Sequence, residues 1–338
     1  MTIRTAIIGF GTGGRVFHAP LLAAEPRFTV SAIVTGDPAR AAAASGYAGA
    51  DILPDAEAVF ARDDLDLVVI TSPHATHAPL ARRAVAAGIA VVVDKPLGIS
   101  STEARSVVEE AEAAGVPLTV FHNRRWDGDF LTLRDTLASG ELGEIRQFES
   151  AFEKWAPQLA ARWKDVATPG QGGGILFDLG PHLIDQALLL FGDVVGVHAE
   201  LDRRRAGAVA DDDVFLSLTH ASGVRSRLWM NATSPADRPR FRVVGSRAVF
   251  TSHGLDPQEP HAKAGLRPLD PGFGVHDDGR TALLSAPGTE RAVPLLPGEH
   301  LAFYRMLGDA LTEGGPLPVD PREAVRGLEI IEAARGRG

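Results

Sequence analysis

Cysteine is absent from the 338 residues of the chain. The absence excludes disulfide bridges, thiolate catalysis and cysteine-bound zinc, so redox chemistry requires a bound cofactor. Long apolar runs are also lacking: no stretch approaches the roughly eighteen residues of a membrane span, and the apolar segment after the N-terminus is too short for a signal peptide. The sequence therefore predicts a soluble, cytoplasmic protein without a membrane partner.

A basic block is missing too. The 34 Lys and Arg residues are scattered and are outnumbered by 43 Asp and Glu, which gives a formal charge of −9. This distribution disfavours a nucleic-acid surface. The histidines and acids show no ligand spacing typical of a metal site, so we expect no metal. Because 338 residues exceed the usual size of one hydrophobic core, we expect two domains.

The first part of the chain alternates apolar runs with alanine-rich segments, which is the pattern of a doubly wound parallel sheet. We predict a dinucleotide-binding Rossmann domain over residues 1–121. Its expected strands are Thr5–Gly9, Thr29–Thr35, Leu67–Thr71, Ala90–Val93 and Leu118–Phe121. Its expected helices are Ala19–Ala24, Pro38–Ala44, Ala78–Ala87 and Thr102–Ala114, the last capped by Ser100 or Ser101.

After residue 121 the pattern changes to alternating apolar and polar residues, which is typical of an antiparallel sheet with one solvated face. We predict an α+β domain over residues 122–318 with an open, mainly antiparallel sheet. A helix is expected at Asp129–Ser139 and a long loop at Ser252–Gly279. The expected strands are Ile145–Phe152, Val195–Leu201, Val214–Thr219 and Arg225–Trp229. Residues 319–338 are expected to form a helix that packs back on the first domain.

The strongest motif is a glycine-rich loop that follows the first predicted strand and opens a helix. Gly9 permits a tight turn, Gly11 lets the backbone approach a pyrophosphate, and Gly14 allows helix and strand to pack closely. In the alternative interpretation the glycines serve only the turn. The motif predicts a dinucleotide site that includes Phe10, Thr12 and Gly13.

The end of the second predicted strand bears on the choice between NAD and NADP. An acidic residue there binds the adenosine ribose in NAD sites, and Asp37 is available, although it can equally cap the following helix. Thr35 and Arg40 instead suit a 2′-phosphate. The sequence favours NADP slightly and leaves NAD possible.

Two later strands end in polar residues at the edge where open α/β sheets bind ligands. One segment carries Thr71, Pro73, His74 and His77, whose histidines either face the ligand or cap and pack locally. The other carries Asp94 and Lys95, where a lysine after a fully apolar strand reaches the same edge or stays solvated.

Asp178 and His182 stand four residues apart and share a face on a continuous helix. Pro181 between them allows a second possibility, that the helix begins at this proline. An aspartate beside an imidazole suits the removal of a hydroxyl proton, but a purely structural pair is the alternative.

Taken together, these motifs resemble the Gfo/Idh/MocA family of oxidoreductases. The resemblance rests on Gly9-x-Gly11-x-x-Gly14, Lys95-Pro96 and Asp178-x-x-x-His182, in an order that spans nearly the whole chain. Three longer segments, 16–22, 121–131 and 177–187, are similar to the NADP-dependent scyllo-inositol dehydrogenase branch.

The resemblance implies a hydride transfer between a nicotinamide and a secondary alcohol or ketone of a cyclic polyol or sugar. It implies that Lys95, Asp178 and His182 are catalytic and contact the substrate, with Lys95 polarising the reacting oxygen and His182 handling the proton. Either Lys95 or His182 is the general base. It also places Asn123 near the nicotinamide, and makes Arg124, Arg162 and Trp163 substrate contacts.

The family commonly has Glu where this chain has Asp94, and its NADP branch often has a Ser-Arg pair where this chain has Gly36-Asp37. The resemblance further implies a homodimer or homotetramer. Alternative functions are a sugar or anhydrosugar reductase of the same family, more remotely an NAD-dependent glycosidase, and a dinucleotide-binding sensor without catalysis.

Overall fold

The computed structural model describes residues 2–160 and 163–336. The chain divides into two compact units, each made of several segments. Unit 1 comprises Met1–Asn123, Gln258–Phe273 and Glu299–Val325, and unit 2 comprises Arg124–Pro257, Gly274–Gly298 and Arg326–Gly338. This partition differs from the expected limits of 1–121, 122–318 and 319–338, because two later segments group with the N-terminal part. Each unit is described by itself.

Unit 1 is built on a six-stranded parallel sheet with the strand order β3-β2-β1-β4-β5-β6. The strands are β1 (Ile3–Ile8), β2 (Phe28–Val34), β3 (Asp51–Leu53), β4 (Leu67–Ile70), β5 (Ala90–Asp94) and β6 (Leu118–Phe121). All four residues of β4 are buried, which explains their uninterrupted apolar sequence. The order reverses between β1 and β4, so the carboxyl ends of these strands form the ligand-binding edge of a Rossmann fold. The predicted fold class of this part is confirmed.

The helices of unit 1 include one π-helix at the glycine-rich loop. They are η1 (Gly13–His18), α1 (Ala19–Ala24), α2 (Pro38–Ala44), α3 (Ala56–Phe60), η2 (His74–Thr76), α4 (His77–Ala86), α5 (Ser101–Ala114), α9 (Gln258–Lys263) and α10 (Leu301–Glu313). Ser100 caps α5 by accepting the amide of Glu103 at 3.2 Å. The expectation of an unbroken loop over Ser252–Gly279 is wrong, because α9 lies within it.

Unit 2 contains an eight-stranded sheet with the order β14-β13-β12-β11-β7-β10-β9-β8. The strands are β7 (Ile145–Glu153), β8 (Val194–Asp202), β9 (Asp213–His220), β10 (Arg225–Asn231), β11 (Phe241–Gly245), β12 (Val249–Ser252), β13 (Thr281–Ala286) and β14 (Thr289–Pro294). Only the β7–β10 pair is parallel among the pairs of described strands in this sheet. The mainly antiparallel sheet is therefore confirmed.

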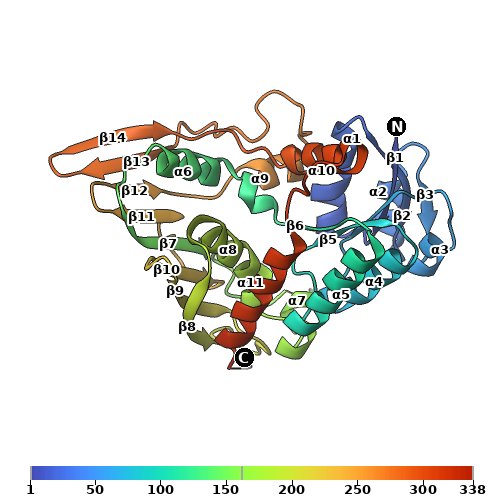
Figure 1. Cartoon of the computed structure of the whole chain (residues 1–338), viewed down its shortest axis with the longest axis horizontal. Coiled ribbons are helices and arrows are strands. Elements are labelled where there is room, and N and C mark those ends of the chain that lie inside the picture. Colours follow the sequence, from blue (N-terminus) through green and yellow to red (C-terminus); the bar gives the residue numbers. More distant parts are fainter. Residues whose placement is uncertain (1, 161–162, 337–338) are drawn as a thin grey trace. The chain divides into compact units, whose positions relative to one another are not determined.

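One long apolar helix packs against the middle of this sheet. It is α8 (Ile175–Phe191), which contacts β7, β9 and β10 and lies beside them in Figure 1. The helix runs through Pro181, so the alternative of a helix beginning at this proline is wrong. The remaining helices described in or entering this unit are η3 (Asn123–Trp126), α6 (Gly128–Ala138), α7 (Trp163–Val166), η4 (Pro169–Gln171) and α11 (Pro321–Ala334).

Across residues 2–160 and 163–336, no helix combines the length and the apolar character that crossing a membrane requires.

Candidate active site

The glycine-rich loop follows β1 and is tied to the end of β4. Thr71 donates its hydroxyl to the carbonyl oxygen of Gly9 at 2.6 Å, and its amide donates to Ile8 at 2.9 Å. Gly9 has a φ of +100°, which disfavours a side chain. A Cβ at Gly14 would lie 2.2 Å from the oxygen of Gly9, whereas a Cβ at Gly11 would meet nothing within 4 Å. The loop is crowded where helix meets strand and open at Gly11, as a site for a pyrophosphate requires.

The other members of the predicted loop have distinct surroundings. Phe10 is buried and packs edge-on against Tyr47, with ring centroids 6.1 Å apart, so its side chain belongs to the core. A Cβ at Gly13 would lie 2.8 Å from Oδ2 of Asp94, so this carboxylate reaches the glycine-rich loop from the end of β5. Thr12 precedes η1 without a side-chain cap bond.

The contacts of Asp37, which follows β2, distinguish between its two predicted roles. Its carboxylate accepts the amide of Arg40 at 3.0 Å and caps α2, so the helix-cap interpretation is confirmed. The Arg40 guanidinium lies 3.8 Å from the same carboxylate and is 53% exposed, and Thr35 accepts the amide of Asp37 at 3.3 Å. Arg40 is thus exposed in the first turn of α2, shortly after the end of β2.

The segment after β4 carries the predicted residues Pro73, His74 and His77. Pro73 is exposed, while His74 and His77 are buried, and their ring centroids lie 5.6 Å apart. Both ring nitrogens of His77 lie 2.7 Å from backbone carbonyl oxygens, those of Pro96 and Ser72. His77 is therefore engaged within the protein, and its geometry does not support a direct contact with a cofactor.

Lys95 directly follows β5 and is half-buried, as is Asp94. The Asp94 carboxylate accepts the Lys95 amide at 2.8 Å, and the Lys95–Pro96 peptide is cis. Parallel pairing of β5 with β4 brings Lys95 to the sheet edge that also carries Thr71. The sequence placed Lys95 correctly at this edge.

In unit 2, Asp178 and His182 lie on the unbroken helix α8, one turn apart on the same face. Asp211 holds the start of this helix: its backbone oxygen accepts the amide of Ile175 at 2.7 Å and its carboxylate accepts that of Leu176 at 2.8 Å. A Cβ at Gly174 would lie 2.5 Å from Asp211 Oδ1, so only glycine fits before the helix. The first turn, which carries Asp178, is thereby fixed.

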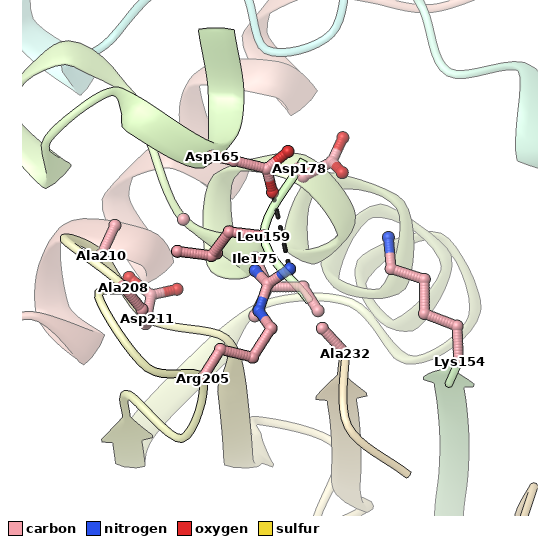
Figure 2. A pocket seen from close by; sticks show the side chains of 11 residues that line it. Lys154, Leu159, Asp165, Ile175, Asp178, Arg205, Ala208, Ala210, Asp211 and Ala232 are labelled. Atoms are coloured by element: carbon pink, nitrogen blue, oxygen red, sulfur yellow. Dashed lines mark ion pairs between the residues drawn. The ribbon is translucent and has the colours of Figure 1, made fainter. Parts of the chain in front are cut away.

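Asp178 also lines a small open pocket of about 20 Å³ within unit 2 (Figure 2). Its charged lining comprises Lys154, Asp165, Asp178, Arg205 and Asp211, and its apolar lining includes Leu159 and Ile175. Arg205 pairs with Asp165 at 3.6 Å and with buried Asp212 at 2.9 Å, and Asp211 pairs with Arg335 at 2.7 Å. The pocket thus presents both signs of charge beside Asp178.

The residues predicted to contact the substrate or the nicotinamide lie in different surroundings. Arg124 is buried, lies 3.3 Å from the Asp127 carboxylate and stacks over Phe152 at 5.1 Å, so much of its side chain serves the interior of unit 2. Trp163 is 39% exposed on α7. Asn123 is buried at the end of unit 1. Arg162 lies outside the described residues.

A buried ionic network holds α8 against the segment that precedes α6. Arg125 donates to Asp185 with two bonds of 2.8 and 2.5 Å, and both side chains are less than 10% exposed. Gln186 donates to the backbone oxygen of Arg124 at 2.9 Å and accepts from buried Arg240 at 2.9 Å. Asp185 and Gln186 lie one turn beyond His182 on α8, so the network fixes the part of the helix that carries His182.

Sequence reasoning missed Lys154 and Arg205. Lys154 directly follows β7, and Arg205 lies in the segment between β8 and β9, far from the recognised motifs. The signal available for Arg205 was the run Arg203-Arg204-Arg205 followed by Asp211-Asp212-Asp213, whose opposite charges suggest pairing. For Lys154 the sequence offers no comparable signal.

Two family models match the chain in the expected order. Residues 3–122 match the oxidoreductase family with an NAD-binding Rossmann fold, and residues 130–251 match the GFO/IDH/MocA C-terminal domain. The fold and its glycine-rich loop thus define an oxidoreductase that binds a nicotinamide dinucleotide, and the chain belongs to the Gfo/Idh/MocA family.

Relatives of the chain match it over nearly its full length. The uncharacterized oxidoreductase YdgJ of Escherichia coli is 37% identical, covering 98% of this chain and 94% of that protein. The scyllo-inositol 2-dehydrogenase (NADP(+)) IolW of Bacillus subtilis is 32% identical, covering 98% and 93%. The solved structure of the putative oxidoreductase yvaA from Bacillus subtilis has a TM-score of 0.93 at 31% identity, covering 99% of this chain and 96% of that chain.

Proposed function

We propose that the chain is an NADP-dependent oxidoreductase that moves a hydride between the nicotinamide and a secondary alcohol or ketone of a cyclic polyol or sugar, as an inositol dehydrogenase does. The observation that carries the proposal is the placement of Asp178 and His182 on one face of α8 in a chain of the Gfo/Idh/MocA family. The similarity to IolW, named as a scyllo-inositol 2-dehydrogenase, supports the substrate class.

The polar side chains around Asp178 offer partners for the hydroxyl groups of an uncharged ligand. The pocket lining has three carboxylates, Asp165, Asp178 and Asp211, against two cations, Lys154 and Arg205. Hydroxyl groups donate to carboxylates and accept from cationic groups, so both signs can bind a polyol. A phosphorylated sugar would need an excess of positive charge, which this lining does not provide.

Oxidation of a secondary alcohol releases a hydride from carbon and a proton from the hydroxyl. A bound nicotinamide supplies the hydride acceptor, while the protein orients the reactants and handles the proton. We assign the proton to His182, which lies one turn after Asp178 on the same face of α8. We assign the polarisation of the reacting oxygen to the ammonium of Lys95.

The preference for NADP rests on Arg40, because its guanidinium is 53% exposed and Asp37 is already used as the cap of α2. A carboxylate committed to a helix cap is a weaker partner for the ribose hydroxyls of NAD. Arg40→Ala should therefore weaken NADP binding and leave NAD binding nearly unchanged, as measured by titration calorimetry. Equal losses for both cofactors would contradict this assignment.

The test of the whole proposal is an assay of purified protein by nicotinamide absorbance in both directions. Reduction of NADP and NAD is measured with scyllo-inositol, myo-inositol, aldoses and sugar phosphates, and oxidation of NADPH and NADH is measured with sugar aldehydes and ketones. We expect turnover with an inositol and NADP, and little with phosphorylated sugars. Turnover only with a sugar aldehyde or ketone in the reductive direction would indicate a sugar or anhydrosugar reductase. Cofactor binding without turnover of any compound would indicate a sensor.

A further inference from the structure

The ring of His77 lies between two loops of unit 1 and faces a backbone oxygen on each side. Nδ1 lies 2.7 Å from the carbonyl oxygen of Pro96, after β5, and Nε2 lies 2.7 Å from that of Ser72, after β4. The side chain is 1% exposed, so bulk water does not replace either contact. His77 therefore spans the carboxyl ends of two neighbouring strands.

The chemistry of this arrangement is unusual because a carbonyl oxygen only accepts hydrogen bonds. A neutral imidazole has one N–H and one lone pair, so it can donate to one carbonyl while its lone pair faces the other. Only the doubly protonated ring donates to both.

His220 of unit 2 provides the contrast. Its Nδ1 lies 2.8 Å from the carbonyl oxygen of Gly192, and its Nε2 lies 2.7 Å from the hydroxyl of Ser226. Because the hydroxyl can donate, a neutral ring satisfies both contacts of His220. Both partners of His77 are carbonyl oxygens, so a neutral ring cannot donate to both of them.

The groups around His77 act on its charge in opposite directions. Burial is the strongest influence and lowers the pKa of His77, whereas the two carbonyl contacts and the Asp94 carboxylate raise it and Lys95 lowers it. The ring of His74 on η2 packs edge-on against that of His77, and a charge on His18 of η1 opposes a charge on His77. His77 is the first residue of α4, where the helix dipole disfavours a cation. The ring is thus neutral near pH 7 and gains its second proton in acid.

We propose that His77 is a positioning residue whose ring ties the loop carrying Lys95 to the loop carrying Ser72, and so sets where the Lys95 ammonium stands. In one tautomer Nδ1–H holds the β5 loop, in the other Nε2–H holds the β4 loop, and the protonated ring holds both. Lys95 is one residue from Pro96, so a change in this tie moves the lysine. The inference rests on the proposed function only through the role of Lys95.

Kinetics of His77→Gln and His77→Phe test the proposal, with His220→Gln as the matched control. Glutamine keeps a donor, whereas phenylalanine keeps an aromatic ring, of larger volume, and loses both bonds. We expect kcat to fall roughly tenfold to a hundredfold in His77→Phe and less in His77→Gln, with the Kd for NADP nearly unchanged. His220→Gln should lower thermal stability and leave kcat as in the wild type. Equal kcat in all four proteins would overturn the proposal.

The pH profile separates positioning from a merely structural role. Wild-type kcat should show an inflection on the acid side of pH 6.5, where the ring takes up its second proton, and His77→Gln should lack it. The same inflection in both proteins would assign it to another group and overturn the titrating role.

A measurement on the wild-type protein needs neither a variant nor turnover. Nitrogen NMR of ¹⁵N-histidine-labelled protein should show the His77 proton shared between the two nitrogens near neutral pH and both nitrogens protonated in acid. A ring held in one tautomer throughout would overturn the bridge. If no polyol is turned over, the proposed function fails, while this spectrum still decides the state of His77.

Discussion

Replacement of Gly14 by alanine is expected to destabilise unit 1 through a single contact. The added Cβ would lie 2.2 Å from the oxygen of Gly9, whereas ordinary contact begins at 3.4 Å, so the loop must open by about 1.2 Å. Backbone atoms cannot relieve this by changing rotamer, and the Gly9 oxygen is held by the Thr71 hydroxyl at 2.6 Å. We expect a cost at the upper end of the overpacking range, about 3 kcal/mol or more.

For a domain of this size that cost corresponds to a fall in Tm of roughly 6–12 °C, measured by circular dichroism without cofactor. Gly11→Ala is the control, because nothing lies within 4 Å of its Cβ position. Its Tm should stay within about 2 °C of the wild type, while its affinity for NADP falls roughly tenfold or more because the methyl group blocks the approach of the pyrophosphate. A wild-type Tm for Gly14→Ala would refute the packing argument, and wild-type affinity for Gly11→Ala would refute the cofactor position.

Three further predictions concern unit 2. His182→Ala should lower kcat roughly a hundredfold with NADP affinity little changed; unaltered turnover would remove His182 from the mechanism. Asp185→Ala removes both hydrogen bonds that the buried Arg125 guanidinium donates to this carboxylate, so urea unfolding should show a loss of about 3–5 kcal/mol, and a loss below about 1 kcal/mol would contradict a stabilising buried ion pair. Burial raises the pKa of Asp129 to about 7, so the folded state binds this proton more tightly than the unfolded state. Its contribution to stability is full below about pH 4 and is lost as the pH rises through about 7; Asp129→Asn should remove this decline in urea titrations, and an unchanged decline would assign it elsewhere.

The parallel sheet was predictable because strands buried on both faces need uninterrupted apolar residues, as in β4 and β5. The elements that were missed lack that signal. β3 has only three residues and is largely exposed, and β14 is exposed along most of its length. Pro181 stays inside α8 although an interior proline costs about 3 kcal/mol, because the helix buries many apolar side chains around it.

The site was predictable where one short motif contains both the functional residue and the sequence signal for its place in the fold. The glycine-rich loop, Lys95 and the Asp178–His182 pair each follow from local sequence and strand order. The two partners of His77 are backbone oxygens, 5 and 19 residues away, and every residue type carries such an oxygen. The pocket beside Asp178 is similar, because Lys154 and Arg205 meet there only through the fold of unit 2. Such contacts leave no pattern in the sequence.

The most direct test of the central claim is the transfer of deuterium from an inositol labelled at its ring carbons to NADP. The account predicts that the nicotinamide product, isolated after turnover and weighed by mass spectrometry, carries one deuterium. Reduced cofactor without the label, or no reduced cofactor with any inositol, would contradict a hydride transfer from a cyclic polyol.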